Sequence, residues 1–330
     1  MATEFEEFHA ELRSVAGDLL AKDRAVEWRM LAEAGWTGLE VCEDLGGAGA
    51  TFAETAVVCE EIGRAASSCG YLGGILAVGL LNMMVPSEIR DELLTGIASG
   101  ALRAAVAVGP MDFVPDAEGA DRLLVVTEDA DGVPVVVDAR DAAVTPQPVV
   151  DETRRLARVS LKNPESLGNL DTSRALRFDG EPEAAVARLM DRAATAVACD
   201  SLGLSEAMLS ATVAYAKVRH QFGRPIGSFQ AVKHACADML VATSVSRRLV
   251  DTAVAAVAQN RPDAAAAVSM AKSYACGAAV DVVGKAMQLH GGIGYTWESG
   301  IHVYLKRAVL NRSLFGSPAE HRRRLAKRYV

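Results

Sequence analysis

The sequence predicts an α+β protein that is mostly α, with a helical N-terminal domain, a small β-domain and a C-terminal four-helix bundle. Half of the 330 residues are apolar and only 5% are aromatic, so Ala, Val and Leu must fill the core. Alanine at this density favours long helices. A local rise in Val, Pro, Asp and Gly marks a middle segment of strands and turns. The predicted domains are therefore 1–100, 101–180 and 181–330.

The N-terminal domain is predicted to consist of helices joined by turns. Apolar residues recur at helical spacing from Phe5 to Leu20. A second helix starts at Trp28 and should stop at Gly35, and a third spans Phe52 to Arg64. The segment from Tyr71 to Pro86 is strongly apolar, and another helix should follow it. We expect these residues to serve packing rather than chemistry.

The middle domain is predicted to be a set of short β-strands. The runs Leu123–Thr127 and Val133–Asp138 are rich in β-branched residues and are bounded by Asp-Gly turns. Arg158–Leu161 and Ala175–Phe178 continue the same pattern. The chain therefore inserts a small β-domain between two helical regions.

Long helices are predicted again in the C-terminal domain. Ala184–Phe222 contains no proline and a single glycine. A second helix begins at Phe229, Pro262 separates it from a third that reaches Gln288, and Ser299–Arg312 forms a last helical region. Short connections between long helices favour an antiparallel four-helix bundle. One face of the first helix is expected to be apolar, with Val197, Leu204, Met208, Ala211 and Tyr215.

Charge, cysteine content and hydropathy exclude several classes of function. A net charge of −8 argues against nucleic acid as a partner. The six cysteines form no C-x-x-C pair, so we expect buried thiols in a reducing compartment and neither disulfides nor a metal site. No apolar run reaches the ~18 residues of a membrane helix, and the acidic N-terminus lacks a signal-peptide pattern. We expect a cytoplasmic protein without a membrane partner.

Two polar, glycine-containing stretches interrupt the C-terminal helices. In Arg219–Gln230, Gly223, Pro225 and Gly227 break a helix, and in Gln288–Tyr295 three glycines within four positions end one. Guanidinium groups fork onto phosphate oxygens, and freed backbone N–H groups favour anions. The two stretches could therefore line a phosphate-bearing planar cofactor. On this chemistry alone, two ordinary helix–helix corners are an equally good explanation.

The same stretches carry a specific sequence pattern. R-x-Q-F-G-x-P-I-x-x-F-Q from Arg219, followed by Q-x-H-G-G-x-G-Y from Gln288, resembles the C-terminal domain of the acyl-CoA dehydrogenase family. Glu60–Arg64 resembles the family's E-E-x-G-R, and the resemblance runs unevenly along nearly the whole chain. It implies an acyl-CoA dehydrogenase-like fold, FAD as cofactor and an acyl-CoA thioester as substrate, oxidised at its Cα–Cβ bond. An electron-transfer flavoprotein would accept the electrons.

The chain departs from the family in its β-domain, which looks shortened. The family's T-E-P-x-x-G-S-D loop and W-I-T-like strand hold the flavin ring and the acyl thioester. The matching segment here, Ala105–Val114, has no cluster of Ser or Thr. No tryptophan lies anywhere between residues 37 and 296. The resemblance therefore does not extend to the part of the family site that holds the flavin ring.

The general base is missing as well. A carboxylate must take the α-proton while hydride leaves to the flavin, and burial beside an apolar chain raises its pKa towards neutrality. In most of the family this base is the Glu of an E-G-T-S motif, and here Phe315 occupies that position before Gly316 and Ser317. A minority of members place the Glu on the first bundle helix, at the position that Ala193 occupies here.

Three nearby acids are candidates for a displaced base. Asp191 lies two positions from Ala193 and so faces another side of the helix. Asp200 lies seven positions on, about two turns or ~10 Å along the axis. Glu320 lies five positions past Phe315. None fits, and we predict no catalytic residue in this chain.

The retained motifs are those that reach across a subunit interface in the family. There they contact the adenine and pyrophosphate half of the FAD held by a neighbouring subunit. The resemblance implies that Arg219 pairs with the pyrophosphate and that Phe222 packs by the adenosine of an FAD shared with a partner subunit. The implied cofactor-binding residues are Arg219, Gln221, Phe222, Phe229, Gln230, Gln288, Gly291 and Gly292.

We therefore expect the non-catalytic subunit of a hetero-oligomer. The chain resembles the shorter subunits of two-gene acyl-CoA dehydrogenases that act on steroid side-chain CoA esters in actinobacteria. Those subunits assemble with a catalytic acyl-CoA dehydrogenase subunit as α2β2 heterotetramers. Two alternatives stay open: a self-sufficient homo-oligomeric FAD enzyme with a displaced base, and a scaffold subunit without flavin contact.

Overall fold

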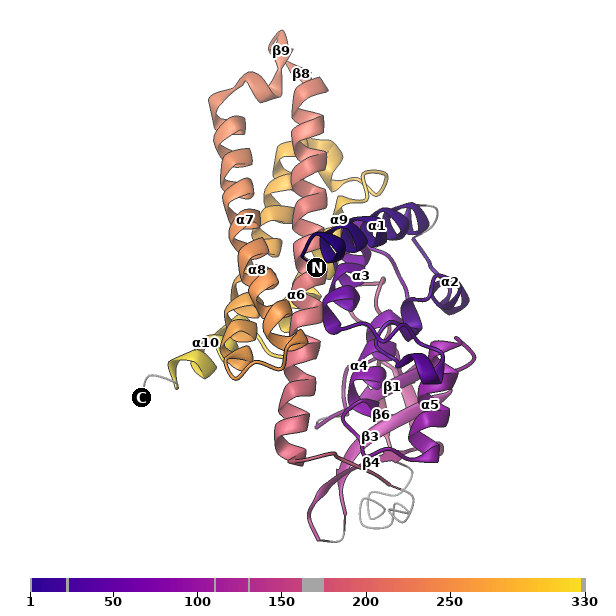
Figure 1. The fold of residues 1–330 in the computed structure, drawn as a ribbon. Coiled ribbons are helices and arrows are strands. Elements are labelled where there is room, and N and C mark those ends of the chain that lie inside the picture. The colour runs from indigo at the N-terminus through magenta and orange to yellow at the C-terminus, as the bar shows by residue number, and fades with distance from the viewer. Residues whose placement is uncertain (1, 22–23, 110, 130, 162–174, 328–330) are drawn as a thin grey trace.

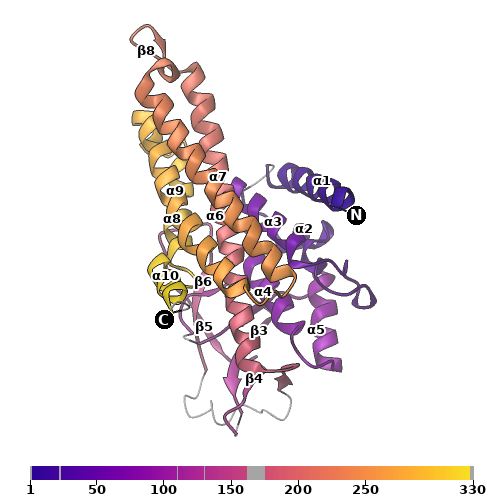
Figure 2. The same cartoon turned by 60° about the vertical axis from the view of Figure 1, so that its left-hand side comes forward.

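A computed structural model of the chain describes residues 2–21, 24–109, 111–129, 131–161 and 175–327. It confirms the predicted fold class, mostly α with a small region of strands. Figure 1 shows a tall bundle of C-terminal helices, with the N-terminal helices and the strands packed along one side of its lower half. The turned view in Figure 2 shows the strands that precede the bundle grouped at its lower end, with one further strand labelled at its upper end.

The N-terminal helices begin and end where capping residues place them. Thr51 forms a capping box with Glu54 at the start of α3, and the Ser87 hydroxyl caps α5. Gly35 takes φ 77° just beyond α2 and ends it, as predicted. Every residue of α4 is buried, which explains its apolar sequence. The elements are α1 (Ala2–Leu20), α2 (Trp28–Glu33), η1 (Trp36–Gly38), η2 (Glu43–Leu45), α3 (Phe52–Ala65), α4 (Tyr71–Leu81) and α5 (Glu88–Ala98).

The strands that precede the C-terminal helices form two small sheets. One has the order β1-β3-β4-β7, with β1 (Ala104–Ala107) parallel to β3 (Arg122–Glu128) and β4 (Pro134–Asp138) antiparallel to it. The predicted β3–β4 hairpin is confirmed, and its loop is held by the Asp129 carboxylate, which accepts the N–H of Val133. The remaining strands are β7 (Leu176–Arg177) in this sheet and β2 (Val114–Pro115), β6 (Leu156–Ser160) and β5 (Ala143–Pro146) in the other.

The C-terminal helices form the bundle, with two corrections to the prediction. The first helix ends at Val218 instead of Phe222, because the next residues pair as a two-stranded hairpin. Its buried face also turns from Ala211, which is exposed, to Thr212 and Ala216. The elements are α6 (Pro182–Val218), β8 (His220–Gln221), β9 (Arg224–Pro225), η5 (Ile226–Ser228), α7 (Gln230–Ala258), α8 (Ala264–His290), η6 (Gly291–Tyr295), α9 (Ile301–Ser313) and α10 (Pro318–Ala326).

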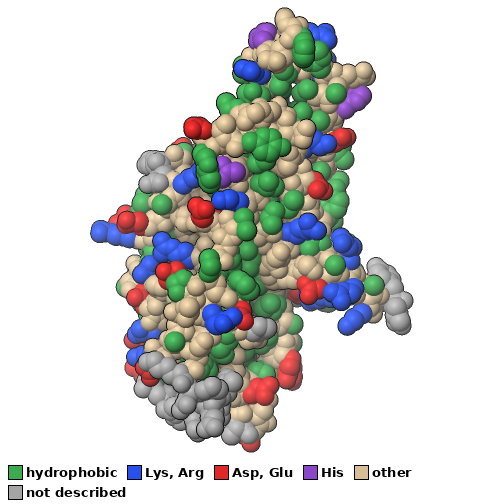
Figure 3. Space-filling model, turned by 180° about the vertical axis from the view of Figure 1, so that it is seen from behind, with side chains coloured by type: hydrophobic (Ala, Val, Ile, Leu, Met, Phe, Trp, Pro, Cys, Tyr) green, Lys and Arg blue, Asp and Glu red, His purple; other side chains and the backbone are tan. Residues whose placement is uncertain are grey.

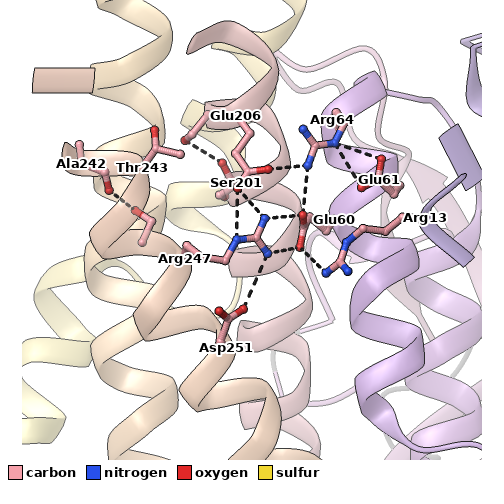
Figure 4. Close-up of polar contacts among 12 residues, drawn as sticks. Arg13, Glu60, Glu61, Arg64, Ser201, Glu206, Ala242, Thr243, Arg247 and Asp251 are labelled. Atoms are coloured by element: carbon pink, nitrogen blue, oxygen red, sulfur yellow. Dashed lines mark hydrogen bonds and ion pairs between the residues drawn. The ribbon is translucent and has the colours of Figure 1, made fainter. Parts of the chain in front are cut away.

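A charged network ties the N-terminal helices to the bundle (Figure 4). Arg247 of α7 donates to both Glu60 of α3, at 2.5 Å, and Glu206 of α6. Arg64 of α3 also pairs with Glu206 and, at 3.0 Å, with Glu61. Burial alone would raise the pKa of Glu206, but the charges of Arg247 and Arg64 lower it overall. The network therefore fixes α3 against α6 and α7.

Two glycines let α3 and α6 cross closely. A Cβ added at Gly63 would lie 2.1 Å from the carbonyl oxygen of Asp200, and one added at Gly203 would lie 2.0 Å from that of Glu60. Each glycine therefore packs directly on the backbone of the other helix, and neither position has room for a side chain.

Gly203→Ala should destabilise the chain by about 2 kcal/mol, because the methyl group would force the two backbones apart. Gly277→Ala in α8 is the matched control, since a Cβ there meets nothing within 4 Å. That helical Gly-to-Ala change should leave stability equal or raise it by up to about 1 kcal/mol. Urea unfolding of both variants measures the difference, and equal midpoints would contradict the close crossing.

All six cysteines are free thiols, with Cys59, Cys199 and Cys276 buried and Cys42 exposed. Among the described residues, no group of three or more His, Cys, Asp or Glu side chains is placed to hold a metal ion. Within the same residues, none of the helices combines the length and apolarity of a bilayer-crossing segment. The basic C-terminal segment lies in α10 up to Ala326, while Arg328 lies outside the described residues.

Candidate functional site

The first predicted stretch forms a hairpin at the end of the bundle that lies away from the sheets (Figure 1). Its two-residue loop has Phe222 at φ 53° and Gly223 at φ 77°. Positive φ at both positions suits the twist of a short hairpin, but it strains a phenylalanine backbone. Phe222 is also 90% exposed, and its ring meets that of Phe229 in an edge-to-face contact, with ring centroids 6.1 Å apart. The chain thus holds an aromatic ring out into solvent.

The other predicted residues of this stretch lie on the hairpin or directly after it. Arg219 and Gln221 lie on one face of the hairpin, because side chains two positions apart along a strand point to the same side. The Ile226 N–H donates to the Arg219 carbonyl at 2.7 Å and fixes the base of the hairpin. Gln230 is the exposed first residue of α7.

The second predicted stretch is the corner where α8 ends. Gly291 takes φ 61° and ψ −141° and closes the helix, and Gln288, Gly291 and Gly292 are all exposed. A Cβ at Gly291 or Gly292 would meet nothing within 4 Å, so an outside group can approach this backbone. Tyr215, in the last turn of α6, stacks on His290 at 4.4 Å. This contact joins the corner to the root of the hairpin, so the predicted residues lie at one end of the bundle.

The two positions of the missing base line a separate cavity of about 600 Å³. Ala193 enters it from α6, and Phe315 enters it from the turn between α9 and α10. The family resemblance implied the two positions separately, and the fold brings them to one cavity. Its walls are mainly aliphatic, with Leu76, Val106, Val108, Val114, Val149, Leu156, Leu189, Met190, Leu310 and Leu314.

The two carboxylates that line this cavity already have partners. Glu320 lines it, contrary to the expectation from its spacing, but its carboxylate caps α10 by accepting the N–H and hydroxyl of Ser317 at 2.6 and 2.7 Å. The Ser317 N–H lowers the pKa of Glu320, whereas a base for this reaction needs a raised one. Asp112 accepts from Arg158 and from Gln147.

The displaced-base candidates on α6 do not line the cavity at all. Asp191 pairs with Arg324 at 2.5 Å. Asp200 is 3% exposed and is held by Arg307 at 2.6 Å and by Arg154 at 3.0 Å. Burial would raise the pKa of Asp200, but the two arginine charges lower it overall. Both aspartates therefore sit in ion pairs within the fold.

The turn that carries Phe315 is held more tightly than its sequence suggests. Phe315 has φ 54°, a left-handed conformation that is unfavourable for an aromatic residue. The buried ammonium of Lys272 donates to the carbonyls of Asn311 at 3.0 Å and Gly316 at 2.8 Å, and burial lowers its pKa. A ring nitrogen of buried His321 lies 3.0 Å from the Phe315 carbonyl. Sequence reasoning missed Lys272 and His321, because nothing in their local pattern signals such long-range contacts.

Two family models and a similar curated protein agree on the family to which this chain is similar. The family model for the acyl-CoA dehydrogenase N-terminal domain matches residues 1–101, and that for the C-terminal domain matches residues 183–330. Acyl-CoA dehydrogenase IpdE2 of Mycobacterium tuberculosis is 36% identical over 93% of this chain and 88% of its own length.

Solved structures agree on the fold. A structure described as the Tcur3481-Tcur3483 steroid ACAD G363A variant superposes with a TM-score of 0.83 and 26% identity, covering 98% of this chain and 97% of that one. A chain of the ChsE4-ChsE5 complex from Mycobacterium tuberculosis gives a TM-score of 0.83 at 23% identity, covering 97% and 96%. The chain therefore belongs to the acyl-CoA dehydrogenase family.

Proposed function

We propose that this chain is a subunit of an FAD-dependent acyl-CoA dehydrogenase that completes the flavin site of a catalytic partner and supplies no base of its own. One observation carries the proposal. The predicted flavin contacts lie on an exposed end of the bundle, whereas the cavity where a base belongs holds Ala193 and Phe315. A surface that faces outward suits a cofactor held by another chain.

The exposed end fits the adenosine and pyrophosphate half of FAD. Arg219 is exposed and can fork onto phosphate oxygens, and Gly291 and Gly292 present open backbone. Phe222 offers a flat apolar face for adenosine. FAD, when bound, accepts the hydride in acyl-CoA oxidation. This chain's residues would bind and orient its nucleotide half.

Exposed apolar side chains near this end support a covered interface. Phe222 is 90% exposed, Val218 71%, Tyr295 69% and Trp297 72%. Side chains of this size seldom face water unless a ligand or partner covers them. Figure 3 shows apolar side chains on the bundle and at its tip. A catalytic acyl-CoA dehydrogenase chain, in an α2β2 assembly, is the partner we propose.

The proposed substrate is an acyl-CoA thioester, with a steroid side-chain CoA ester as the specific class. The similarity to a structure described as a steroid ACAD supports this class. The proposed electron acceptor is an electron-transfer flavoprotein, and the proposed compartment is the cytoplasm. The residue ranges 1–100, 101–180 and 181–330 remain our proposed domain division.

Co-expression with the product of the neighbouring reading frame tests the proposal. The chain purified alone should carry little flavin and reduce no dye with acyl-CoA. The co-purified complex should hold fewer FAD molecules than chains, be active, and have the native mass of a heterotetramer. Flavin per chain, dye reduction and native mass are the measurements.

The same experiment separates the alternatives. Stoichiometric flavin and activity in the isolated chain would establish a self-sufficient homo-oligomer instead. An active complex whose flavin content is the same with and without Arg219→Ala would establish a scaffold without flavin contact.

A further inference from the structure

The pairing of the two hairpin strands gives a defined position to Arg224, a residue to which the sequence motifs assign no role. Gln221 and Arg224 are direct cross-strand partners on either side of the two-residue loop, so their side chains lie on the same face. Arg219 shares that face, because it lies two positions before Gln221. Two guanidinium groups therefore flank one amide on a single face of an exposed hairpin.

The Arg224 guanidinium is held in place by an aromatic ring. Its central carbon lies 4.2 Å from the ring centroid of Phe229, within the range of a cation–π contact. Phe229 in turn meets Phe222 edge-on. This cation–π contact holds the guanidinium over the ring, and no hydrogen bond to the described residues occupies its N–H groups.

Neither arginine is neutralised by a carboxylate in the part of the chain that the structure describes. No hydrogen bond or ion pair joins the side chain of Arg219 or Arg224 to any of the described residues, although this chain has a net charge of −8. By contrast, Arg247 and Arg307 each pair with buried carboxylates. Two guanidinium groups on one face of the hairpin can each donate to one phosphate of a diphosphate.

We propose that Arg224 is a second phosphate-binding residue of the flavin half-site, so that Arg219 and Arg224 together clamp the two phosphates of a pyrophosphate. This inference rests on the proposed function. A dinucleotide such as FAD satisfies both arginines, whereas FMN, with one phosphate, satisfies one. The clamp therefore selects the pyrophosphate-linked form of the flavin. Coenzyme A also carries an adenosine diphosphate, so the test must separate the two sources.

Reconstitution of the flavin-free complex tests the assignment, using Arg224→Ala, Arg219→Ala and the control Arg188→Ala. Arg188 is exposed on α6, and its change removes the same charge. Arg224→Ala should weaken FAD binding about 10- to 100-fold and leave FMN binding within about twofold, because a charged hydrogen bond is lost only with FAD. Arg224→Lys keeps the charge but loses the planar, two-pronged guanidinium. Its FAD affinity should therefore lie between those of Arg224→Ala and the unmodified complex. Arg188→Ala should match the unmodified complex.

The possible outcomes distinguish failure of the role proposed for Arg224 from failure of the proposed function. If Arg219→Ala loses FAD and Arg224→Ala behaves like the control, the second clamp residue is refuted while the proposed function stands. If neither arginine matters, the proposed function itself fails. If Arg224→Ala raises the KM for acyl-CoA with FAD affinity unchanged, the residue contacts coenzyme A and the assignment to flavin is overturned. Should Arg224→Ala fail to assemble by native mass, Arg224→Lys decides by the same comparison.

Discussion

Arg219→Ala should lower the FAD affinity of the complex between this chain and its catalytic partner by about 100-fold, since a charge-assisted fork to phosphate contributes about 3 kcal/mol at most. The side chain is exposed and makes no ion pair with the described residues, so the change should not disturb folding. Equilibrium reconstitution with FAD, followed by flavin fluorescence, measures the effect. The melting temperature of the isolated variant should equal that of the unmodified chain.

This prediction distinguishes a flavin site shared between two chains from a site that one chain forms alone. Changing a residue on one chain should empty a flavin site whose ring contacts belong to the other. Dehydrogenase activity should fall with flavin content and return at high FAD concentration, because the reacting groups are untouched. Full flavin content in the Arg219→Ala complex would refute the shared half-site. Arg188→Ala is the matched control for lost charge.

Local sequence signals were enough to predict the helices and the two motifs. Gly35 and Pro262 mark helix boundaries through their own backbone geometry, which does not depend on the residues that pack against them. The Arg219 and Gln288 patterns likewise mark helix ends, which are local events. Such signals place elements and identify the fold class without knowledge of what packs against what.

Sequence signals failed where a distant partner decides the outcome. The first bundle helix stops at Val218 because the next residues pair with Arg224 and Pro225 across a turn. Glu320 lines the cavity because α10 folds back after Ser317. The proposed role of Arg224 depends on its cross-strand partner Gln221 and on its contact with Phe229. None of these contacts follows from periodicity, since each joins residues whose pairing the fold alone determines.

Asp200 shows the same limit, because its sequence position made it a candidate base while its contacts make it the centre of a buried network. Arg307 donates to it from Nε at 3.0 Å and from Nη2 at 2.6 Å, Arg154 lies at 3.0 Å, and Asn311 donates at 2.6 Å. Arg307 is 1% exposed. The network joins α6 to α9 and to the segment before β6, so it couples three parts of the fold.

Asp200→Asn should destabilise the chain by about 3–5 kcal/mol, because it leaves the buried guanidinium of Arg307 and the largely buried one of Arg154 without this counter-charge. The pH dependence has a definite sign. The folded-state pKa of Asp200 lies below its ordinary value, so its contribution is complete above about pH 4 and is lost as pH falls through the folded pKa. The stability gap between variant and unmodified chain should therefore be constant near neutrality and shrink in acid.

Urea unfolding across pH measures that gap, and Asp251→Asn is the matched control. Asp251 pairs with Arg247 at 3.7 Å with its side chain 53% exposed, so its loss should cost less than about 1 kcal/mol. The same variants decide whether Asp200 acts in chemistry. If Asp200 has a structural role alone, the complex that carries Asp200→Asn should keep the turnover per bound flavin of the unmodified complex. The assay must be made under conditions in which the variant is still folded. A variant of unchanged stability that lost turnover would instead make Asp200 the displaced base and return the chain to the self-sufficient class.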